Sequence, residues 1–302
     1  MDELEVVAIE ANLFPTIRPL VRERPDFAWH RDRFKRVTAN QAISSQAFAI
    51  DFFGTISRLA SRNAIVNRWM NELNLSGEGR WQIEFEVLIP KEVLREPRST
   101  QVDVLAACET GVVLFECKFT EPDGGACSQP VPIAGGAHHG LRQCNGRYEE
   151  QINPVSGSVS RCALTGKGIR YWDLIPEVMN LDRDVNYHPC PVSGGWYQWM
   201  RNLVAALALG EHRHVRPAFV VVYVDGPFPM AKRVAAPEWN RLEDAVRGKK
   251  VPLRAVSYQQ LLEVALGAAA PNDRVVMEEL RFWLIKKIEK ATVAREVQDL
   301  AT

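Results

Sequence analysis

The sequence has no excess of charge of either sign and no long apolar run. Its 37 lysines and arginines balance 37 aspartates and glutamates, so the formal net charge is zero. A protein that coats nucleic acid without selectivity is usually strongly basic, so we expect any nucleic-acid contact to use a local basic groove. One of the longest apolar runs, Leu203 to Leu209, is far too short to cross a membrane.

The chain also lacks a basic leader, internal repeats and low-complexity tracts. Its first residues, Met1-Asp2-Glu3-Leu4-Glu5, are acidic where a secretory signal would be basic. We therefore expect a cytoplasmic protein with no membrane segment. In that compartment, the six cysteines are expected to be thiols or metal ligands rather than disulfides.

What is present is an ordinary globular composition, with 46% hydrophobic and 25% charged residues among 302. We expect a single domain over residues 1–302 with four parts. These are a helical N-terminal part (1–76), a strand meander (77–121), an irregular cysteine-rich insert (122–195), and a helix-strand-helix C-terminal part (196–302).

The periodicity of apolar residues changes along the chain. Helical spacing predicts a helix opened by Asn40 and a second helix over 55–73. Apolar and polar residues then alternate over 81–87, which is typical of a half-buried strand. Further strands are predicted over 100–107, 111–119, 218–224 and 251–256, and further helices over 196–209, 258–266 and 274–300. This order predicts an α/β fold with a central mixed sheet flanked by helices.

The short connection between strands 100–107 and 111–119 predicts an antiparallel hairpin. If the turn residues are Glu109 and Thr110, Asp103 lies directly opposite Glu116. Lys118 shares a face with Glu116, because side chains on one face of a strand repeat every second residue. A three-residue loop would instead turn Asp103 to the other face, so the juxtaposition depends on loop length.

Two facing carboxylates repel each other, and a divalent cation between them reverses that effect. Their hard oxygen ligands suit Mg²⁺ or Mn²⁺, and Lys118 would place a positive charge beside a phosphate. The alternative is surface charge near a strand end. The apolar neighbours of Asp103 and Glu116 favour a functional site, because an unpaired carboxylate is costly in such a strand.

This arrangement resembles the PD-(D/E)XK nuclease superfamily. The motif residues are Asp103 in the second strand and Glu116-Cys117-Lys118 in the third. More narrowly, the chain is similar to a prokaryotic restriction-endonuclease-like group over residues 40 to 225, through Ser44-Ser45-Gln46-Ala47-Phe48 and Trp196-Tyr197-Gln198-Trp199-Met200-Arg201-Asn202. The resemblance implies Asp103 and Glu116 as Mg²⁺ ligands, the Cys117 carbonyl as a further ligand, and Lys118 as the catalytic lysine.

The sequence departs from the superfamily pattern at two places. Val102 stands where the motif has its proline. Many members also carry a glutamate on the helix before the sheet, where this chain has Gln46; Glu84 and Glu86 are the alternative third acidic ligands.

Gln198 and Arg201 are expected on one face of the helix over 196–209, because they are three residues apart. RecB-like nucleases place a glutamine near the active site on a similar helix, so we expect this pair to contact nucleic acid, with Arg201 at a phosphate. The alternative is an exposed polar face of the helix.

Four of the six cysteines fall in the irregular insert. Four thiolates can bind a tetrahedral zinc ion or an iron–sulfur cluster, although the sequence has no CxxC pair. The alternative is a set of partly buried free thiols. The four residues are Cys127, Cys144, Cys162 and Cys190.

Together these features predict a Mg²⁺- or Mn²⁺-dependent enzyme that hydrolyses phosphodiester bonds in DNA, with a role in restriction or defence. It would act alone, as a homodimer or with a partner subunit. One alternative is a catalytically silent protein of the same fold that binds nucleic acid or a partner, and another is a zinc-organised interaction module.

Overall fold

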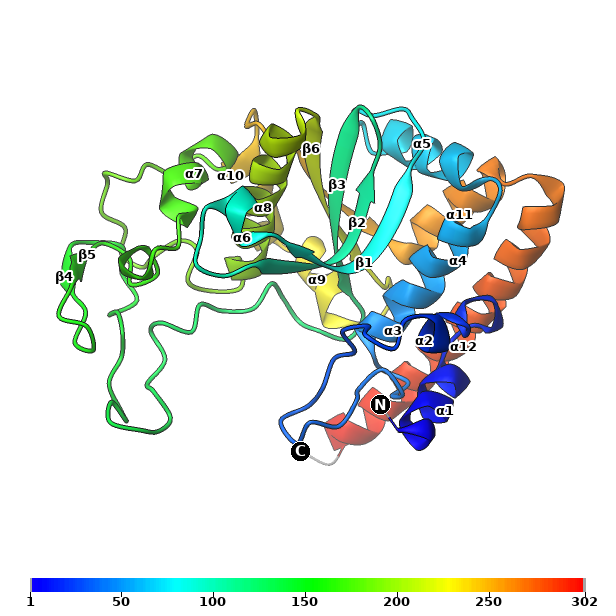
Figure 1. Ribbon diagram of the computed structural model, residues 1–302, viewed down its shortest axis with the longest axis horizontal. Coiled ribbons are helices and arrows are strands. Elements are labelled where there is room, and N and C mark those ends of the chain that lie inside the picture. The colour runs from blue at the N-terminus through cyan, green and yellow to red at the C-terminus, as the bar shows by residue number, and fades with distance from the viewer. Residues whose placement is uncertain (1, 301–302) are drawn as a thin grey trace.

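The computed structural model describes residues 2–300, with side chains described up to residue 295. Its main sheet has five strands in the order β1-β2-β3-β6-β7 (Figure 1). The strands are β1 (Gln82–Ile89), β2 (Thr100–Ala107), β3 (Gly111–Lys118), β6 (Arg216–Tyr223) and β7 (Leu253–Ser257). β1, β2 and β3 form an antiparallel meander, and β3, β6 and β7 run parallel to one another. The predicted mixed sheet is confirmed.

Both faces of the sheet are covered by helices, which explains why β3 and most of β6 are buried. Val113 and Phe115 of β3 pack into one apolar cluster, and Val112 and Leu114 pack into another on the opposite face. Strands buried on both faces read as nearly continuous apolar runs, as they do here.

The first cluster is formed with the N-terminal and C-terminal helices, on the right in Figure 1. These are α1 (Glu3–Asn12), η1 (Pro15–Ile17), α2 (Leu20–Glu23), α3 (Ser45–Ala49), η2 (Ile50–Gly54), α4 (Thr55–Arg58), α5 (Arg62–Glu72), α11 (Tyr258–Ala268) and α12 (Pro271–Leu300). The second cluster is formed with α6 (Lys91–Leu94), α7 (Tyr171–Val178), α8 (Tyr197–Arg213), α9 (Pro229–Val234) and α10 (Pro237–Val246).

The two predicted N-terminal helices are wrong in detail. The first begins after Ser44, not Asn40, because the Ser44 hydroxyl accepts a hydrogen bond from the Ala47 amide. The second is interrupted at Leu59, whose extended backbone ends α4 before α5 begins. Between α3 and α4, η2 is a π-helical turn that holds Asp51 fully buried.

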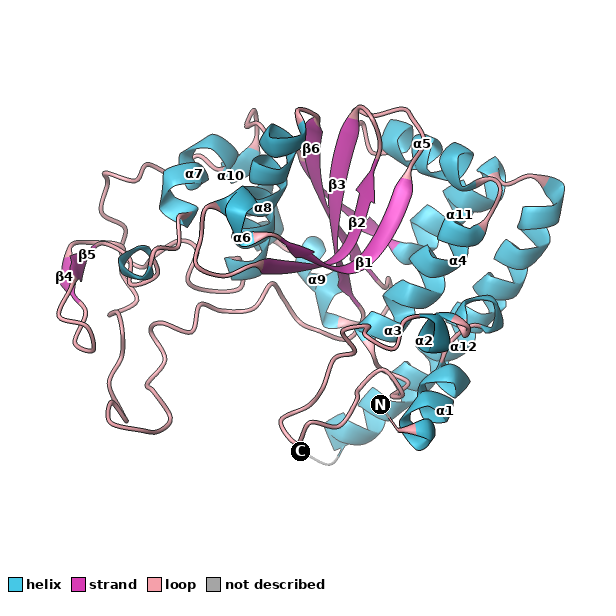
Figure 2. Cartoon of the chain, viewed as in Figure 1, coloured by secondary structure: helices cyan, strands magenta, loops and turns pink. Residues whose placement is uncertain are grey.

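The insert over 122–195 is mostly loop, as predicted, and extends away from the sheet in Figure 2. It contains the short strands β4 (Gln151–Ile152) and β5 (Val159–Ser160), the turn η3 (Thr165–Lys167), and α7, which the sequence patterns did not predict. Tyr148 stacks on Trp172 of α7 with ring centroids 3.5 Å apart, so the insert has a small aromatic core of its own.

In the part of the chain that the structure describes, no helix has both the length and the apolar character needed to cross a membrane.

Candidate active site

The turn between β2 and β3 has the length that brings Asp103 opposite Glu116. The Cys108 amide donates to the Gly111 carbonyl at 2.9 Å, so Glu109 and Thr110 form the turn. Val104 pairs with Phe115, and the next position along this register places Asp103 beside Glu116. The predicted register is therefore confirmed.

The sheet bends at the same level. Phe85 and Val104 pack into the cluster on one face, whereas Val87 and Val102, two residues further along each strand, pack into the cluster on the other. Glu86 lies at the bend with a left-handed φ of 50°, which is uncommon for a residue other than glycine. The strand pairs on either side, Phe85 with Val104 and Val87 with Val102, place Glu86 opposite Asp103. Glu86, Asp103 and Glu116 therefore form a row of three carboxylates across the sheet, called the carboxylate row below.

Asp103 is partly buried and has a backbone partner in β3. Its Oδ2 accepts a hydrogen bond from the Cys117 amide at 2.8 Å. Burial raises the pKa of Asp103 well above its ordinary value, and the negative charges of Glu116 and Glu86 add to the rise. Without a cation, this carboxyl group therefore tends to keep its proton.

Glu116 is buried and has two side-chain donors. Oε1 accepts from Lys118 Nζ at 2.8 Å, and Oε2 accepts from Asn202 Nδ2 on α8 at 2.6 Å. Burial alone would raise the pKa of Glu116. The charge and hydrogen bond of Lys118, with help from Arg201 and Asn202, outweigh burial and leave that pKa below its ordinary value. Glu116 is thus an ionised carboxylate.

Lys118 lies between the strand and α8. Its Nζ also donates to Gln198 Oε1 at 2.9 Å and sits 5.6 Å from the centre of the Trp199 ring. Burial would lower the pKa of Lys118, but the charges of Glu116, Asp103 and Glu121 raise it overall. The amine is therefore a cation at neutral pH and suits electrostatic stabilisation rather than proton abstraction.

The structure brings Gln198 to the site, and Arg201 lies near it on the same helix. Arg201 is half-buried, its charge lowers the pKa of Glu116, and its Nε has no hydrogen-bond partner among the described residues. An unpaired buried donor is costly, which makes this guanidinium a suitable receptor for a phosphate oxygen. The nucleic-acid contact of Gln198 and Arg201 stays a prediction.

Glu86, not Glu84, is the glutamate of β1 that joins the site. Glu84 is exposed, whereas the buried Glu86 accepts from Gln46 at 2.7 Å and from Gln101 at 2.5 Å. The His30 Nε2 lies 3.2 Å from the same carboxylate, and this contact raises the pKa of His30. Gln46 therefore contacts the candidate site by hydrogen bonding to a glutamate rather than by replacing one.

Sequence reasoning assigned no role to Asn202, His30 or Gln101. Asn202 was detectable, because it lies four residues after Gln198 and such residues share a helix face. His30 lies in a segment without periodicity, and nothing in the sequence connects it to Glu86.

The donor chemistry of the site fits a hard divalent cation, since Asp103 and Glu116 are adjacent carboxylates in a sheet row that also contains Glu86. As the side chains stand, no group of three or more His, Cys, Asp or Glu residues in the described chain is arranged to hold a metal ion. Asp103 and Glu116, joined by the Cys117 carbonyl, are the residues that would hold Mg²⁺ or Mn²⁺.

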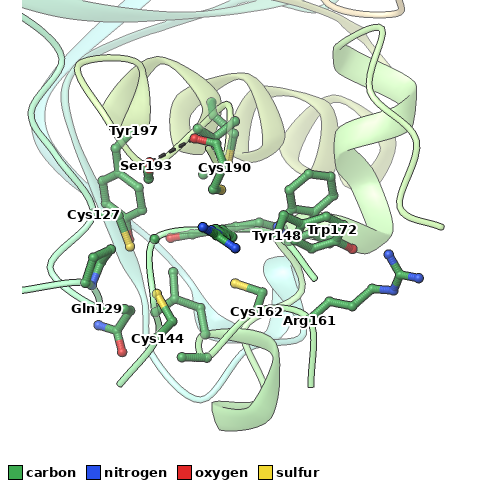
Figure 3. A pocket seen from close by; sticks show the side chains of 18 residues that line it. Cys127, Gln129, Cys144, Tyr148, Arg161, Cys162, Trp172, Cys190, Ser193 and Tyr197 are labelled. Carbon is green, nitrogen blue, oxygen red and sulfur yellow. Dashed lines mark hydrogen bonds between the residues drawn. The ribbon is translucent and has the colours of Figure 1, made fainter. Parts of the chain in front are cut away.

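The four cysteines of the insert line one small cavity of about 30 Å³, separate from the carboxylate row (Figure 3). All four are free thiols. Burial raises the pKa of Cys127 to about 11 and that of Cys190 to about 12. The cysteines outside the insert differ: Cys117 is buried in the sheet core, and Cys108 is half-buried beside the hairpin turn.

A mixed sheet with helices on both faces and acidic residues at the β2–β3 hairpin defines a restriction-endonuclease-like α/β protein. The chain belongs to the family described as restriction endonuclease associating with ARP, whose family model matches residues 8–287. No curated protein and no solved structure gives a significant match. The family supports a role in nuclease-based defence.

Proposed function

We propose that this protein is a PD-(D/E)XK nuclease that hydrolyses phosphodiester bonds in DNA with Mg²⁺ or Mn²⁺. The observation that carries the proposal is the contact of Lys118 with Glu116 at 2.8 Å, one strand away from Asp103. Two acidic side chains and one cation at this place in the sheet match the chemistry that phosphodiester hydrolysis needs.

Each residue has a distinct task in this proposal. When bound, the metal ion would supply Lewis-acid activation of water and charge neutralisation at the phosphate. Asp103 and Glu116 would hold it through carboxylate oxygens. Lys118 remains protonated and stabilises the negative charge that builds up on the phosphate. Gln198 fixes the position of that ammonium group through its hydrogen bond at 2.9 Å.

The DNA backbone would meet the helix that supplies Gln198. Arg201 lies on the same helix, and its buried Nε has no hydrogen-bond partner among the described residues, so its guanidinium group is the proposed phosphate contact. Because the whole chain is neutral, this local arginine, rather than a general basic surface, would draw the backbone to the site.

One observation favours a second candidate, a catalytically silent binding protein of the same fold. Both oxygens of Glu116 already accept hydrogen bonds from protein side chains, Lys118 and Asn202. A metal ion must compete with these donors. If it fails to do so, the protein binds DNA or a partner without cutting.

The family description also names an associated factor, ARP. We propose that this chain acts in the cytoplasm with such a partner in defence against foreign DNA.

The deciding experiment is cleavage of plasmid and single-stranded DNA by the purified full chain with Mg²⁺, Mn²⁺ or EDTA. We expect metal-dependent cutting that falls by at least about 100-fold in Asp103→Ala and in Lys118→Ala. Glu84→Ala is the matched control, because Glu84 is an exposed glutamate on the neighbouring strand. Cutting that survives in both site variants would reject the proposed centre, and DNA binding without cutting would favour the silent alternative.

A further inference from the structure

The cavity in the insert is lined by cysteines from four separate segments of the chain. Cys127, Cys144, Cys162 and Cys190 are spread over more than sixty residues and still meet around one space (Figure 3). Chance burial of thiols would not bring all four cysteines of a loop-rich segment together. The cavity wall is completed by Tyr197 and Met200 of α8, so it lies against the helix that serves the active centre.

Backbone hydrogen bonds connect three of these segments in a closed ring. The Cys127 amide donates to the Ser193 carbonyl at 2.8 Å, and the Cys190 amide donates to the Gly146 carbonyl at 2.9 Å. The Cys144 amide donates to the Gln129 carbonyl at 3.3 Å, which closes the ring.

The fourth segment joins through η3. Lys167 donates to the Gln129 side chain at 2.5 Å, and the Gly166 amide donates to the Cys162 carbonyl at 3.2 Å. These hydrogen bonds connect the four cysteine-bearing segments to one another.

We propose that Cys127, Cys144, Cys162 and Cys190 together bind one zinc ion as four thiolates. Four Zn–S bonds form, and the four thiol protons leave to solvent. As placed, no three ligand side chains in the described chain are close enough to hold a metal, so binding draws the sulfurs inward to about 2.3 Å from the ion.

The ligand set favours one zinc ion over an iron–sulfur cluster. A tetrahedral zinc ion needs only the four thiolates that line the cavity, whereas a cluster also needs inorganic sulfide. Zinc with four thiolates has a net negative charge, which Arg147 and Arg161 in the cavity wall and nearby Lys167 offset.

The proposed zinc would link the insert to the active centre without entering the reaction. The insert begins just after Lys118, and its two ends are held together where the Gly124 amide donates to the Gly195 carbonyl and the Gln198 amide donates to the Gly124 carbonyl. Gly124 is required here, because a Cβ would lie 2.5 Å from the Trp199 ring. The zinc site thus fixes the chain on both sides of the Lys118–Gln198 contact.

The test is metal analysis by mass spectrometry on the purified full chain, expressed with zinc and iron both present. We expect about one zinc per chain, lost in Cys144→Ser and Cys162→Ser and retained in Cys108→Ser, the matched control outside the insert. Asp103→Ala should also retain the zinc, which separates this site from the nuclease centre.

If the cysteine variants fail to fold, the same question is tested on the wild-type protein by exchanging its zinc for cobalt. Intense thiolate-to-cobalt absorption with tetrahedral bands would support four thiolate ligands, and their absence would overturn the proposal. Folded wild-type protein without zinc, zinc content indifferent to the insert cysteines, or iron with labile sulfide and visible absorption would each overturn it as well.

Discussion

At the scale of single residues, the three carboxylates of the sheet row are held in different ways. The negative charge of Glu116 is stabilised by hydrogen bonds from Lys118 and Asn202. Glu86 is compensated by amide donors and a histidine. Asp103 accepts a hydrogen bond from one backbone amide and from no cationic side chain among the described residues, and the charge of nearby Lys118 only partly offsets its burial. Asp103 is therefore the member of the row whose charge a bound cation would stabilise most.

Asp103→Asn should raise the stability of the metal-free protein while abolishing cleavage. Burial and the charge of Glu116 raise the folded-state pKa of Asp103 above its unfolded value. The stability that its neutral form contributes is therefore fully present below the unfolded pKa. That stability is lost as the pH rises through the folded-state pKa. Asparagine is neutral at every pH and keeps an oxygen acceptor for the Cys117 amide. We expect a melting temperature a few degrees above wild type at pH 8, measured with EDTA by calorimetry.

The difference should shrink as pH falls towards 4, because the wild-type carboxyl then gains its proton. Glu84→Gln removes an exposed charge from the neighbouring strand and is the control. A wild-type protein more stable than Asp103→Asn at pH 8 without metal would contradict the raised pKa assigned to Asp103.

The residues of the site differ in how far the sequence predicts them. Asp103 and Glu116 follow from turn length and alternation, because a hairpin with a two-residue turn has a single register. Asn202 and His30 do not follow, because their contacts depend on how α8 and the loop after α2 pack on the sheet. The apolar–polar pattern of two strands and the length of their turn predict which residues pair across a hairpin. Contacts made by a helix or a loop depend on how it packs against the sheet, which the pattern does not predict.

At the scale of elements, strands were easier to predict than helix ends. Val112 to Phe115 are apolar throughout and β-branched or aromatic at three of four positions, which favours a buried strand, and that is where they are found. The π-helical turn η2 was not predictable from apolar spacing, because the spacing around Asp51 fits an ordinary helix. It is held by tertiary contacts: Asp51 accepts from the Phe14 amide at 2.6 Å and from Lys287 of α12 at 2.5 Å.

Asp51→Asn should destabilise the protein by about 3–5 kcal/mol, because it leaves the buried Lys287 ammonium without its counter-ion. Adding Lys287→Met should restore part of that loss, since the buried charge is removed and asparagine still accepts from the Phe14 amide, although its NH2 group then faces the Trp283 Nε1 donor. Urea unfolding of the single and double variants measures both effects.

Asp244→Asn provides the comparison, because Asp244 forms an exposed pair with Arg247 and should change stability by less than about 1 kcal/mol. A double variant no more stable than Asp51→Asn would mean that Asp51 acts through its other contacts and not through the ion pair with Lys287.

At the scale of the whole molecule, the chain has two kinds of order. The sheet and its helices are held by two large apolar clusters. The insert over 122–195 has its aromatic core and the cysteine cavity but little regular structure. The composition of residues 122–195, rich in Gly, Pro and Ser, predicts an irregular segment. It does not predict that four cysteines meet, because loop closure over such distances is set by the fold.

Removing the proposed zinc should therefore loosen the insert and leave the sheet intact. Hydrogen exchange read by mass spectrometry compares the full chain as purified with the same chain after zinc is stripped by a strong chelator. We expect exchange in peptides from 122–195 to accelerate by at least about tenfold, while peptides from β2 and β3 keep their protection, because local openings are independent of the main core. Adding Mg²⁺ should not restore protection in the insert, whereas adding Zn²⁺ should. Unchanged protection of the insert in verified zinc-free protein would show that the aromatic core alone orders it, and the metal would then have no structural role.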